Sequence, residues 1–399
     1  MYKNLWSNGY KEVAEFPDYT FDEHFGQPTP TFAPRAVLKD YLEGRMIRKS
    51  DKDLKNFIEF STVVRWIKFD DLTKKYTVTV NNLKMGETRE EMFTHIVVAV
   101  GIYNTPFILD IPGMDKFNGR LFHSHDFRDA TEFKGQKVLL IGSGYSGEDI
   151  ALQLMKFGAT KISLSYKSVP KNATCIMPQE IEEKPLVIKL DAKKAYFIDG
   201  TKEEFDSVIL CTGYRNYFPF LESRFRIPEE THFYPPGLYM GALFFKEGNN
   251  TLFYVGVQIL FYSFTYFEAL AVWTCRYIMG NLKGEPKTLK EMEDDSNIWM
   301  KRAESIKSET EGLHFQTDHI DTLVEKSEYE YPLTKVKTLM HEWIKVRKEG
   351  LGLTRYRDHV VKSPFTGFKG LKQKPFMENF DDSLEAFLNV ASSDDISIA

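Results

Sequence analysis

The sequence predicts an α/β protein with a nucleotide-binding unit in the middle of the chain, and three neighbouring features predict it. Residues 137–141 form a continuous aliphatic run, which is typical of a buried parallel strand. The run leads directly into a glycine-rich turn, residues 142–147, and then into a helical apolar pattern that ends at Gly158. Residues 161–167 form a second strand-like run, so the order is strand, turn, helix and strand.

Other elements are expected on both sides of this unit. Further strands are predicted at residues 57–61, 63–69, 76–80, 95–100, 195–198, 208–211 and 252–257. Helices are predicted at residues 35–44, 264–279, 289–306 and 336–349. Boundaries near residues 124 and 210 then divide the chain into residues 1–124, 125–210 and 211–399.

Composition excludes several classes of protein. With 399 residues, 42% of them hydrophobic and 27% charged, the chain can bury a large core and is expected to be globular. A formal net charge of −5 argues against a nucleic-acid-binding surface. No apolar run approaches the roughly 20 residues of a membrane span, and no signal peptide opens the chain, so no membrane association is expected. Cys175, Cys211 and Cys275 form no CxxC pair or metal-like cluster, which favours a cytoplasmic protein without a metal site.

The glycine-rich turn is a GxGxxG sequence with its glycines at Gly142, Gly144 and Gly147. Gly142 permits a tight turn, Gly144 lets the backbone approach a pyrophosphate, and Gly147 lets the helix pack close to the strand. The helix N-terminus then offers unpaired N–H groups to the phosphates. In this setting the motif predicts dinucleotide binding, and the alternative is a tight glycine turn without a ligand.

The end of the second strand indicates which dinucleotide binds. An acid there would bind a ribose 2′-hydroxyl, whereas a cation would suit a 2′-phosphate. Lys167 stands twenty residues after Gly147 (167 − 147), and no Asp or Glu occurs between Lys161 and Gln179. The sequence therefore favours NADP over NAD, and the alternative is a lysine that is only solvated.

A further motif lies just ahead of this unit. Phe117, Gly119, His123 and Phe127 match the pattern FxGxxxHxxx(Y/F). Together with the GxGxxG that follows, it makes the chain resemble the flavin-containing monooxygenase family. Related Baeyer–Villiger monooxygenases have Trp at the last motif position, so Phe127 points away from ketone oxygenation.

The resemblance extends along the whole chain. Residues 211–214, Cys-Thr-Gly-Tyr with Thr212 and Gly213 at the centre, resemble the family's (A/C)TGY signature. Four segments resemble the bacterial trimethylamine monooxygenase branch: residues 2–9, 19–26, 356–359 and 381–388.

The resemblance implies two Rossmann-like domains, an FAD-binding domain interrupted by an inserted NADPH-binding domain. In such enzymes NADPH reduces FAD, and the reduced flavin captures O2 as a C4a-hydroperoxide that oxygenates a soft nucleophile. The implied substrate is the nitrogen of a small tertiary amine such as trimethylamine, or the sulfur of a sulfide. A homodimer is common in similar enzymes, and the motif histidine is thought to link the domains.

The resemblance also carries roles to residues around the nicotinamide dinucleotide. Asn8 matches an asparagine that contacts the oxygenating flavin and NADP+, where an amide can both donate and accept hydrogen bonds. The alternative is an ordinary turn residue, because Ser-Asn-Gly is also a turn sequence. Tyr145 and Ser146, joined by Ser143 and the backbone of Gly144, match contacts to the NADP phosphates and ribose.

Contacts to FAD and to the substrate are implied in the same way. Val64, Gln258 and Thr265 match positions that meet FAD, and Phe261 and Tyr262 would line the substrate pocket at the start of a helix. For Phe261 the alternative is core packing of that helix.

Three departures from the family pattern bear on cofactor and substrate. Lys167 replaces the usual Arg. A lysine offers one point charge where the planar guanidinium of arginine can form two hydrogen bonds, so recognition of the 2′-phosphate is expected to be weaker. Ile259-Leu260-Phe261 replaces Asp-Gln-Trp, so a pocket there would be less polar and slightly larger. No strand–GxGxxG–helix unit precedes residue 36, so an N-terminally truncated FAD domain that holds FAD weakly is expected. The alternative function is an NADP-binding remnant without oxygenase activity.

Overall fold

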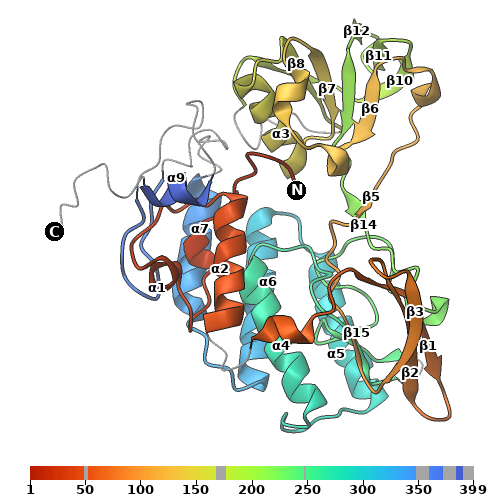
Figure 1. Ribbon diagram of the computed structural model, residues 1–399, viewed down its shortest axis with the longest axis vertical. Coiled ribbons are helices and arrows are strands. Elements are labelled where there is room, and N and C mark those ends of the chain that lie inside the picture. The colour runs from red at the N-terminus through yellow and green to blue at the C-terminus, as the bar shows by residue number, and fades with distance from the viewer. Residues whose placement is uncertain (49–52, 168–176, 247–248, 347–358, 372–382, 390–399) are drawn as a thin grey trace.

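The computed structural model describes residues 1–48, 53–167, 177–246, 249–346, 359–371 and 383–389, which form two units (Figure 1). The smaller unit, at the top of Figure 1, contains the glycine-rich turn, and the larger unit contains the long helices and two further sheets. Cys175, residues 356–358 and residues 381–382 of the sequence motifs lie outside the described residues.

A five-stranded parallel sheet in the order β6, β13, β7, β8 and β9 forms the centre of the smaller unit. The strands are β6 (Arg120–His123), β13 (Ser207–Leu210), β7 (Lys137–Ile141), β8 (Lys161–Ser165) and β9 (Ile181–Lys184). Alternate side chains of β7 face opposite sides of the sheet. Val138 and Leu140 face helix α3 (Tyr145–Lys156), whereas Leu139 and Ile141 face a second sheet. Burial on both faces explains why these strands are continuous apolar runs.

The second sheet of the smaller unit is antiparallel and three-stranded. It comprises β10 (Val187–Asp191), β11 (Lys194–Phe197) and β12 (Lys202–Glu204). Leu190, Ala195 and Phe197 are buried between the two sheets.

Two short strands connect the units. β5 (Thr105–Pro106) leads into the smaller unit, β14 (Tyr214–Arg215) leads out of it, and the two pair antiparallel (Figure 1). The parallel sheet already includes β6, so it begins ahead of the boundary expected near residue 124. The chain crosses between the units at these two strands.

The larger unit contains a four-stranded sheet in the order β15, β16, β17 and β4. Its strands are β15 (Leu238–Tyr239), β16 (Leu243–Phe244), β17 (Leu252–Tyr254) and β4 (Ile96–Val98), and the last two are parallel. An antiparallel meander of β1 (Thr62–Asp70), β2 (Lys75–Asn82) and β3 (Glu87–Phe93) lies beside it. Ile67 and Tyr76 of the meander share a buried cluster with Leu238 and Leu252 of the sheet.

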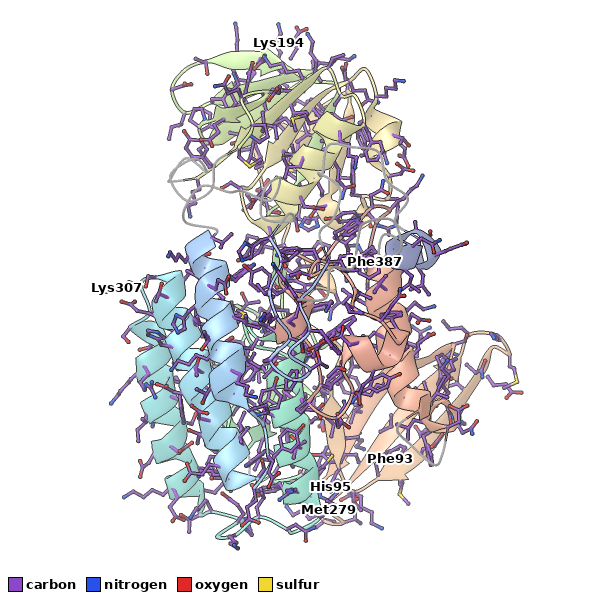
Figure 2. The ribbon with its side chains drawn as sticks, turned by 90° about the vertical axis from the view of Figure 1, so that its left-hand side faces the viewer. Phe93, His95, Lys194, Met279, Lys307 and Phe387 are labelled. Atoms are coloured by element: carbon purple, nitrogen blue, oxygen red, sulfur yellow. The ribbon has the colours of Figure 1, made fainter. Side chains whose placement is uncertain are left out.

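Long helices make up the rest of the larger unit, and several of them lie side by side in Figure 2. They are α2 (Arg35–Arg48), α4 (Ser263–Ile278), α5 (Leu289–Glu304), α6 (Glu309–Lys326) and α7 (Leu333–Val346), with the short α1 (Phe21–Phe25) and α9 (Leu384–Asn389). Capping boxes begin α5, from Thr288 to Glu291, and α6, from Ser308 to Glu311. Met279, directly after α4, lies at the end remote from the smaller unit (Figure 2), so the N-terminus of α4 points towards that unit.

Short 3-10 helices join these elements. They are η1 (Lys11–Val13), η2 (Leu54–Phe57), η3 (Met114–Lys116), η4 (Ser124–Asp126), η5 (Ala130–Phe133) and η7 (Ser223–Phe225). None of the described helices is long and apolar enough to cross a membrane.

Most of the predicted elements are confirmed within a few residues, and one is wrong. Residues 57–61 are not a strand, because Phe57 and Phe60 are exposed and have no strand partner among the described residues. Several elements are absent from the prediction, among them strands β3, β6, β9 and β10 and helix α6. β3 is largely polar, and α6 carries Gly312 in its first turn, so neither has a strong apolar period. Residues 347–349 of the last predicted helix lie outside the described residues.

Candidate functional site

The glycine-rich turn lies at the carboxyl end of the parallel sheet, between β7 and α3. Gly142 has a φ of 110°, and a Cβ there would lie 2.3 Å from the carbonyl oxygen of Cys211. A Cβ on Gly147 would lie 2.1 Å from the carbonyl oxygen of Gly142. These two glycines are therefore required by close backbone packing, as their roles in a dinucleotide turn predict.

Gly144 is in a different environment. It is exposed, and a Cβ on it would meet no atom within 4 Å. It is also the N-cap residue of α3, and no side chain caps the helix there. The first N–H groups of α3 thus face an open surface, an arrangement that fits a phosphate group.

The other expected dinucleotide contacts surround this turn. Tyr145 is exposed, and Ser143 and Ser146 are half-buried. Lys167 is exposed two residues after the end of β8, which is the strand next to β7. The residues present therefore fit a dinucleotide whose pyrophosphate lies at α3 and whose ribose end lies near β8.

The motif of Phe117, Gly119, His123 and Phe127, which precedes β7 in the chain, has a structural role. A Cβ on Gly119 would lie 2.3 Å from the carbonyl oxygen of Asp206, so the chain must approach closely there. Phe117 and Phe127 are buried, and Phe127 packs edge-on against Tyr2, with 5.2 Å between ring centroids.

His123 and the Cys-Thr-Gly-Tyr segment meet where the chain crosses between the units. His123 is buried, its Nδ1 accepts the backbone N–H of His125 at 3.0 Å, and burial lowers its pKa. Its ring packs edge-on against Tyr214, with 5.2 Å between centroids. The hydroxyl of Thr212 donates to the carbonyl oxygen of Phe107, and the carbonyl oxygen of Gly213 accepts the N–H of Phe107 at 2.9 Å. These contacts fix the two crossing strands to each other.

The segment that contains Asn8 runs from one unit to the other. At its start, Tyr2 donates from its hydroxyl to Asp149 of α3 at 2.7 Å, and Gln153 of α3 donates to the carbonyl oxygen of Asn4 at 3.1 Å. At its end, the indole N–H of Trp343 in α7 donates to the carbonyl oxygen of Asn8 at 2.9 Å. Asn8 is thereby held between α3 of the smaller unit and α7 of the larger one.

Asn8 itself lies in a tight bend. The hydroxyl of Ser7 donates to the carbonyl oxygen of Gly9 at 2.7 Å, which is a local turn contact. The Asn8 side chain is half-buried and makes no hydrogen bond within the described part of the chain. The turn therefore exists and leaves the amide available to a ligand.

The expected flavin contacts after β17 are largely engaged in packing. Gln258 is buried, and its amide donates to the carbonyl oxygen of Gly241 at 2.5 Å and accepts the N–H of Val257 at 3.1 Å. The hydroxyl of Thr265 donates to the carbonyl oxygen of Val13 at 3.0 Å. Both side chains therefore stabilise the loop and helix α4, and both residues are fully buried.

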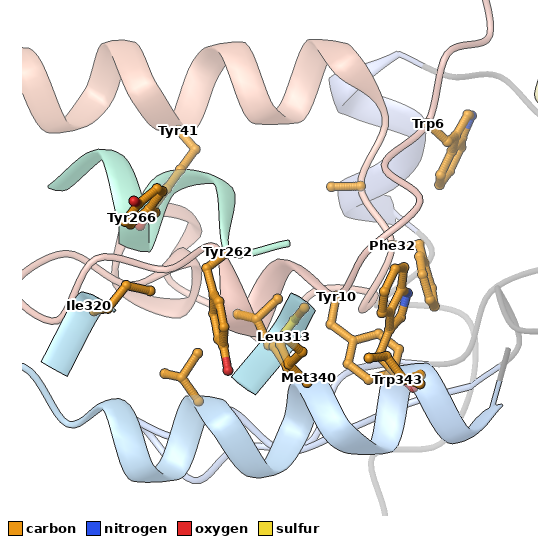
Figure 3. Packing of buried hydrophobic residues seen from close by; sticks show 14 of the residues in the cluster. Trp6, Tyr10, Phe32, Tyr41, Tyr262, Tyr266, Leu313, Ile320, Met340 and Trp343 are labelled. Carbon is orange, nitrogen blue, oxygen red and sulfur yellow. The ribbon is translucent and has the colours of Figure 1, made fainter. Parts of the chain in front are cut away.

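Tyr262 and Phe261, the two residues expected to line the substrate pocket, differ in how deeply they are buried. Tyr262 is buried in the hydrophobic cluster shown in Figure 3, its hydroxyl lies 2.9 Å from that of Thr317, and burial raises its pKa to about 12. Phe261 is half-buried and stacks on Phe233 at 5.9 Å. Of the two, Phe261 is the side chain with accessible surface.

Val64 lies on β1 beside an irregularity in the pairing with β2, between Val64 and Trp66. Val64 is 39% exposed and Trp66 is 40% exposed. Val97 of β4, at the edge of its sheet, is similarly exposed. Each of these residues leaves apolar surface accessible on its strand.

Single-sequence reasoning missed the contacts that hold the site together. Gln316 of α6 is fully buried and binds three backbone groups of residues 259–262. Asp149 and Gln153 fasten the N-terminal segment to α3. No spacing or periodicity marks these residues, since each acts on a distant segment. No cluster of possible metal ligands occurs among the described residues.

Comparisons with known proteins agree with this arrangement. The model of the family described as flavin-binding monooxygenase-like matches residues 1–170 and 170–340. A trimethylamine monooxygenase of Methylocella silvestris is 42% identical over 391 residues, which cover 98% of this chain and 84% of the relative. A trimethylamine monooxygenase of Pelagibacter ubique is 38% identical over 98% of this chain and 85% of its own.

Solved structures show the same relationship. The crystal structure of Tmm from Pelagibacter sp. strain HTCC7211 superposes with a TM-score of 0.90 at 36% identity, over 97% of this chain and 86% of that one. S-allyl-L-cysteine S-oxygenase from Allium sativum gives a TM-score of 0.74 at 26% identity, over 90% and 81% of the two chains. The chain therefore belongs to the flavin-binding monooxygenase family, as an enzyme of the flavin-containing monooxygenase type.

Proposed function

We propose that this chain is an FAD- and NADPH-dependent monooxygenase that oxygenates the nitrogen of small tertiary amines such as trimethylamine. The observation that carries the proposal is the position of Asn8, which is tied to α3 through Tyr2 and Asn4 and to α7 through Trp343. This places an available amide between the dinucleotide turn and the larger unit. The relatives that carry the name trimethylamine monooxygenase support the substrate class.

NADPH would bind along the edge formed by the turn after β7 and the end of β8. Gly142, Gly144 and Gly147 would carry the pyrophosphate, with Ser143, Tyr145 and Ser146 around it, and Lys167 would meet the 2′-phosphate. Lys167 supplies one compact charge and not a bidentate fork, so we expect only moderate selectivity for NADPH over NADH.

FAD would lie in the larger unit, with Val64 near its adenine end and the backbone of Gln258 and Thr265 near its ring. A bound reduced flavin supplies the activation of O2. The chain's own contribution is to hold Asn8 in its bend and to exclude water with the aromatic side chains of residues 261–262. Coverage of 84–86% of the relatives does not favour an NADP-binding remnant without activity.

A second substrate class is favoured by one observation. Ile259 and Phe261 are half-buried, apolar and adjacent to the expected flavin position. A pocket lined by them offers little hydrogen bonding, which suits a larger apolar amine or a sulfide.

The decisive test follows the visible spectrum of the chain mixed with FAD under anaerobic conditions. We expect a spectrum of bound oxidised flavin that NADPH bleaches, followed on admission of air and trimethylamine by amine-dependent NADPH consumption and N-oxide formation. A spectrum of free flavin that NADPH leaves unchanged would contradict the proposal. Faster turnover with a dialkyl sulfide than with trimethylamine would assign the second substrate class instead.

A further inference from the structure

We propose that the larger unit carries a second ligand site, for a small aromatic acid or phosphate that bears a hydroxyl or amino group. The site is a half-open cavity of about 480 Å³ between the segment that follows β14 and the end of β16. Such a volume is within the usual range for small-molecule sites. Its lining includes Tyr217, Phe218, Arg226, Phe244 and Lys246.

The charges at this cavity are unbalanced. Glu229, a lining residue, pairs with Arg215 at 2.9 Å, and Arg224 pairs with Asp71 at 3.0 Å and with Glu222 at 3.7 Å. Arg226 and Lys246 make no ion pair with any carboxylate in the described ranges. Two positive charges are therefore left for an anion.

Arg226 is also held in place. Its Nε donates to the carbonyl oxygen of Leu221 at 2.8 Å, and its Nη2 donates to that of Pro219 at 3.1 Å. Neutral carbonyl groups orient the guanidinium without cancelling its charge. A fixed guanidinium and an exposed lysine on one cavity are a favourable arrangement for a carboxylate or phosphate.

A buried amide supplies a second and independent indication of a ligand. Asn216 lines the cavity and is 3% exposed, yet its Oδ1 has no hydrogen-bond partner among the described residues. Its Nδ2 donates to the carbonyl oxygens of Pro228 at 3.2 Å and Glu230 at 3.1 Å, which fixes the orientation of the amide. An unsatisfied buried acceptor is costly, so a ligand O–H or N–H would restore the missing bond.

The apolar walls suit a flat ring. Phe218 and Phe244 are buried at the cavity, and Tyr217 is partly exposed with the guanidinium of Arg215 over its ring at 5.4 Å. Aromatic faces of this kind stack on planar groups. None of the residues assigned above to NADPH, FAD or the amine lines this cavity, so the site is independent of the proposed oxygenation.

Calorimetric titration of the full chain with 4-hydroxybenzoate tests the site. Benzoate, which lacks the donor for Asn216, phenol, which lacks the charge, and phenyl phosphate are the matched probes. We expect saturable binding of 4-hydroxybenzoate in the millimolar range or tighter, weaker binding of benzoate and of phenol, and a loss of affinity with added salt. The relative affinities of benzoate and phenyl phosphate then identify the preferred anion.

The variant K246M should weaken 4-hydroxybenzoate about tenfold, as expected for the loss of one charge-assisted contact. Lys202, an exposed lysine on β12 of the smaller unit, provides the matched control K202M, which should bind as the parent does. Lys246 is exposed, so its replacement should not prevent folding. Absence of saturable binding, or equal affinities of the two variants, would overturn the proposal.

Discussion

The side-chain oxygen of Gln316 accepts the backbone N–H of Phe261 at 2.7 Å, across a sequence separation of 55 residues. The same oxygen lies 3.4 Å from the N–H of Tyr262, and the amide nitrogen of Gln316 donates to the carbonyl oxygen of Ile259. One fully buried side chain of α6 thus fixes the backbone of the loop that precedes α4.

The replacement Q316L should loosen this loop. It leaves buried backbone groups without partners, at a cost of about 1–3 kcal/mol each, so we expect a lower melting temperature and a raised KM for the amine. The isosteric variant Q316E keeps the acceptor, but its ionised carboxylate would be buried without a cation and would face the carbonyl oxygen of Ile259, so its defects should be at least as large as those of Q316L. Glu325, exposed on the same helix, provides the control E325Q. A KM for Q316L equal to that of the control would show that the loop does not depend on Gln316.

Two glycines of the turn should respond differently to alanine. G147A would place a Cβ 2.1 Å from the carbonyl oxygen of Gly142, so we expect α3 to shift and the protein to lose about 2–4 kcal/mol of stability. G144A meets no atom, and its φ of −75° suits alanine, so stability should be retained. A methyl group there would still obstruct a pyrophosphate, and NADP+ affinity should fall about tenfold. Thermal unfolding and NADP+ titration separate the two effects, and similar behaviour of both variants would contradict the assignment.

Lys167 should determine the preference for the 2′-phosphate. K167M is expected to weaken NADPH binding about tenfold while leaving NADH binding unchanged, because only NADPH carries the additional charge. Lys137, exposed at the start of β7 and therefore at the opposite end of that strand from the turn, provides the control K137M. Fluorescence titrations with both dinucleotides measure the ratio. Equal losses for NADPH and NADH would place the 2′-phosphate elsewhere.

Glu15 should make stability depend on pH. Burial raises its pKa from 4.5 to about 7, an effect that Lys11 and the hydroxyl of Ser363 partly oppose. Between these two values the folded protein keeps a proton that the unfolded carboxyl has released, so the free energy of unfolding falls as pH rises. The full effect corresponds to at most about 3 kcal/mol and is complete above pH 7.

The variant E15Q replaces the carboxyl group of Glu15 with an amide, which does not ionise in this pH range. Its free energy of unfolding, measured by denaturant titration from pH 5 to pH 8, should fall less steeply than that of the parent protein. E330Q, at an exposed glutamate, should retain the parental slope. Parallel curves for parent and E15Q would show that Glu15 is ionised in the folded protein throughout this range.

Local signals in the sequence predicted the strand, turn, helix and strand of residues 137–167 in the smaller unit. The run of β7, the three glycines and the end of β8 are consecutive in the chain, so residues 137–167 contain both the strands and the turn that they form. The turn around Asn8 was predictable for the same reason. Helix α6 was not, because its formation depends on burying Leu313, Ile320 and Leu323 against other helices more than on its own composition.

The side-chain roles after β17 depend on contacts that the sequence does not display. Gln258 was expected to meet a flavin, and the structure places its amide on Gly241, 17 residues earlier in the chain. The hydrogen bond from the backbone of Phe261 to Gln316 and the hydrogen bond from Tyr2 to Asp149 also join segments that are far apart in sequence. Such pairs follow from tertiary packing, for which a single sequence contains no periodic signal.

The attachment of residues 2–4 to α3 has a mechanical consequence. The two units are connected by β5, β14 and this segment, and the segment ends on Trp343 of the larger unit. A rotation of the smaller unit about the paired strands must therefore be taken up by residues 2–4, because Leu5 and Ser7 are hydrogen-bonded to Arg35 and Ala33 of the larger unit. The bend at Asn8 is fixed to the larger unit on both sides, by these two bonds and by Trp343, so a change in the orientation of the smaller unit would move α3 relative to Asn8.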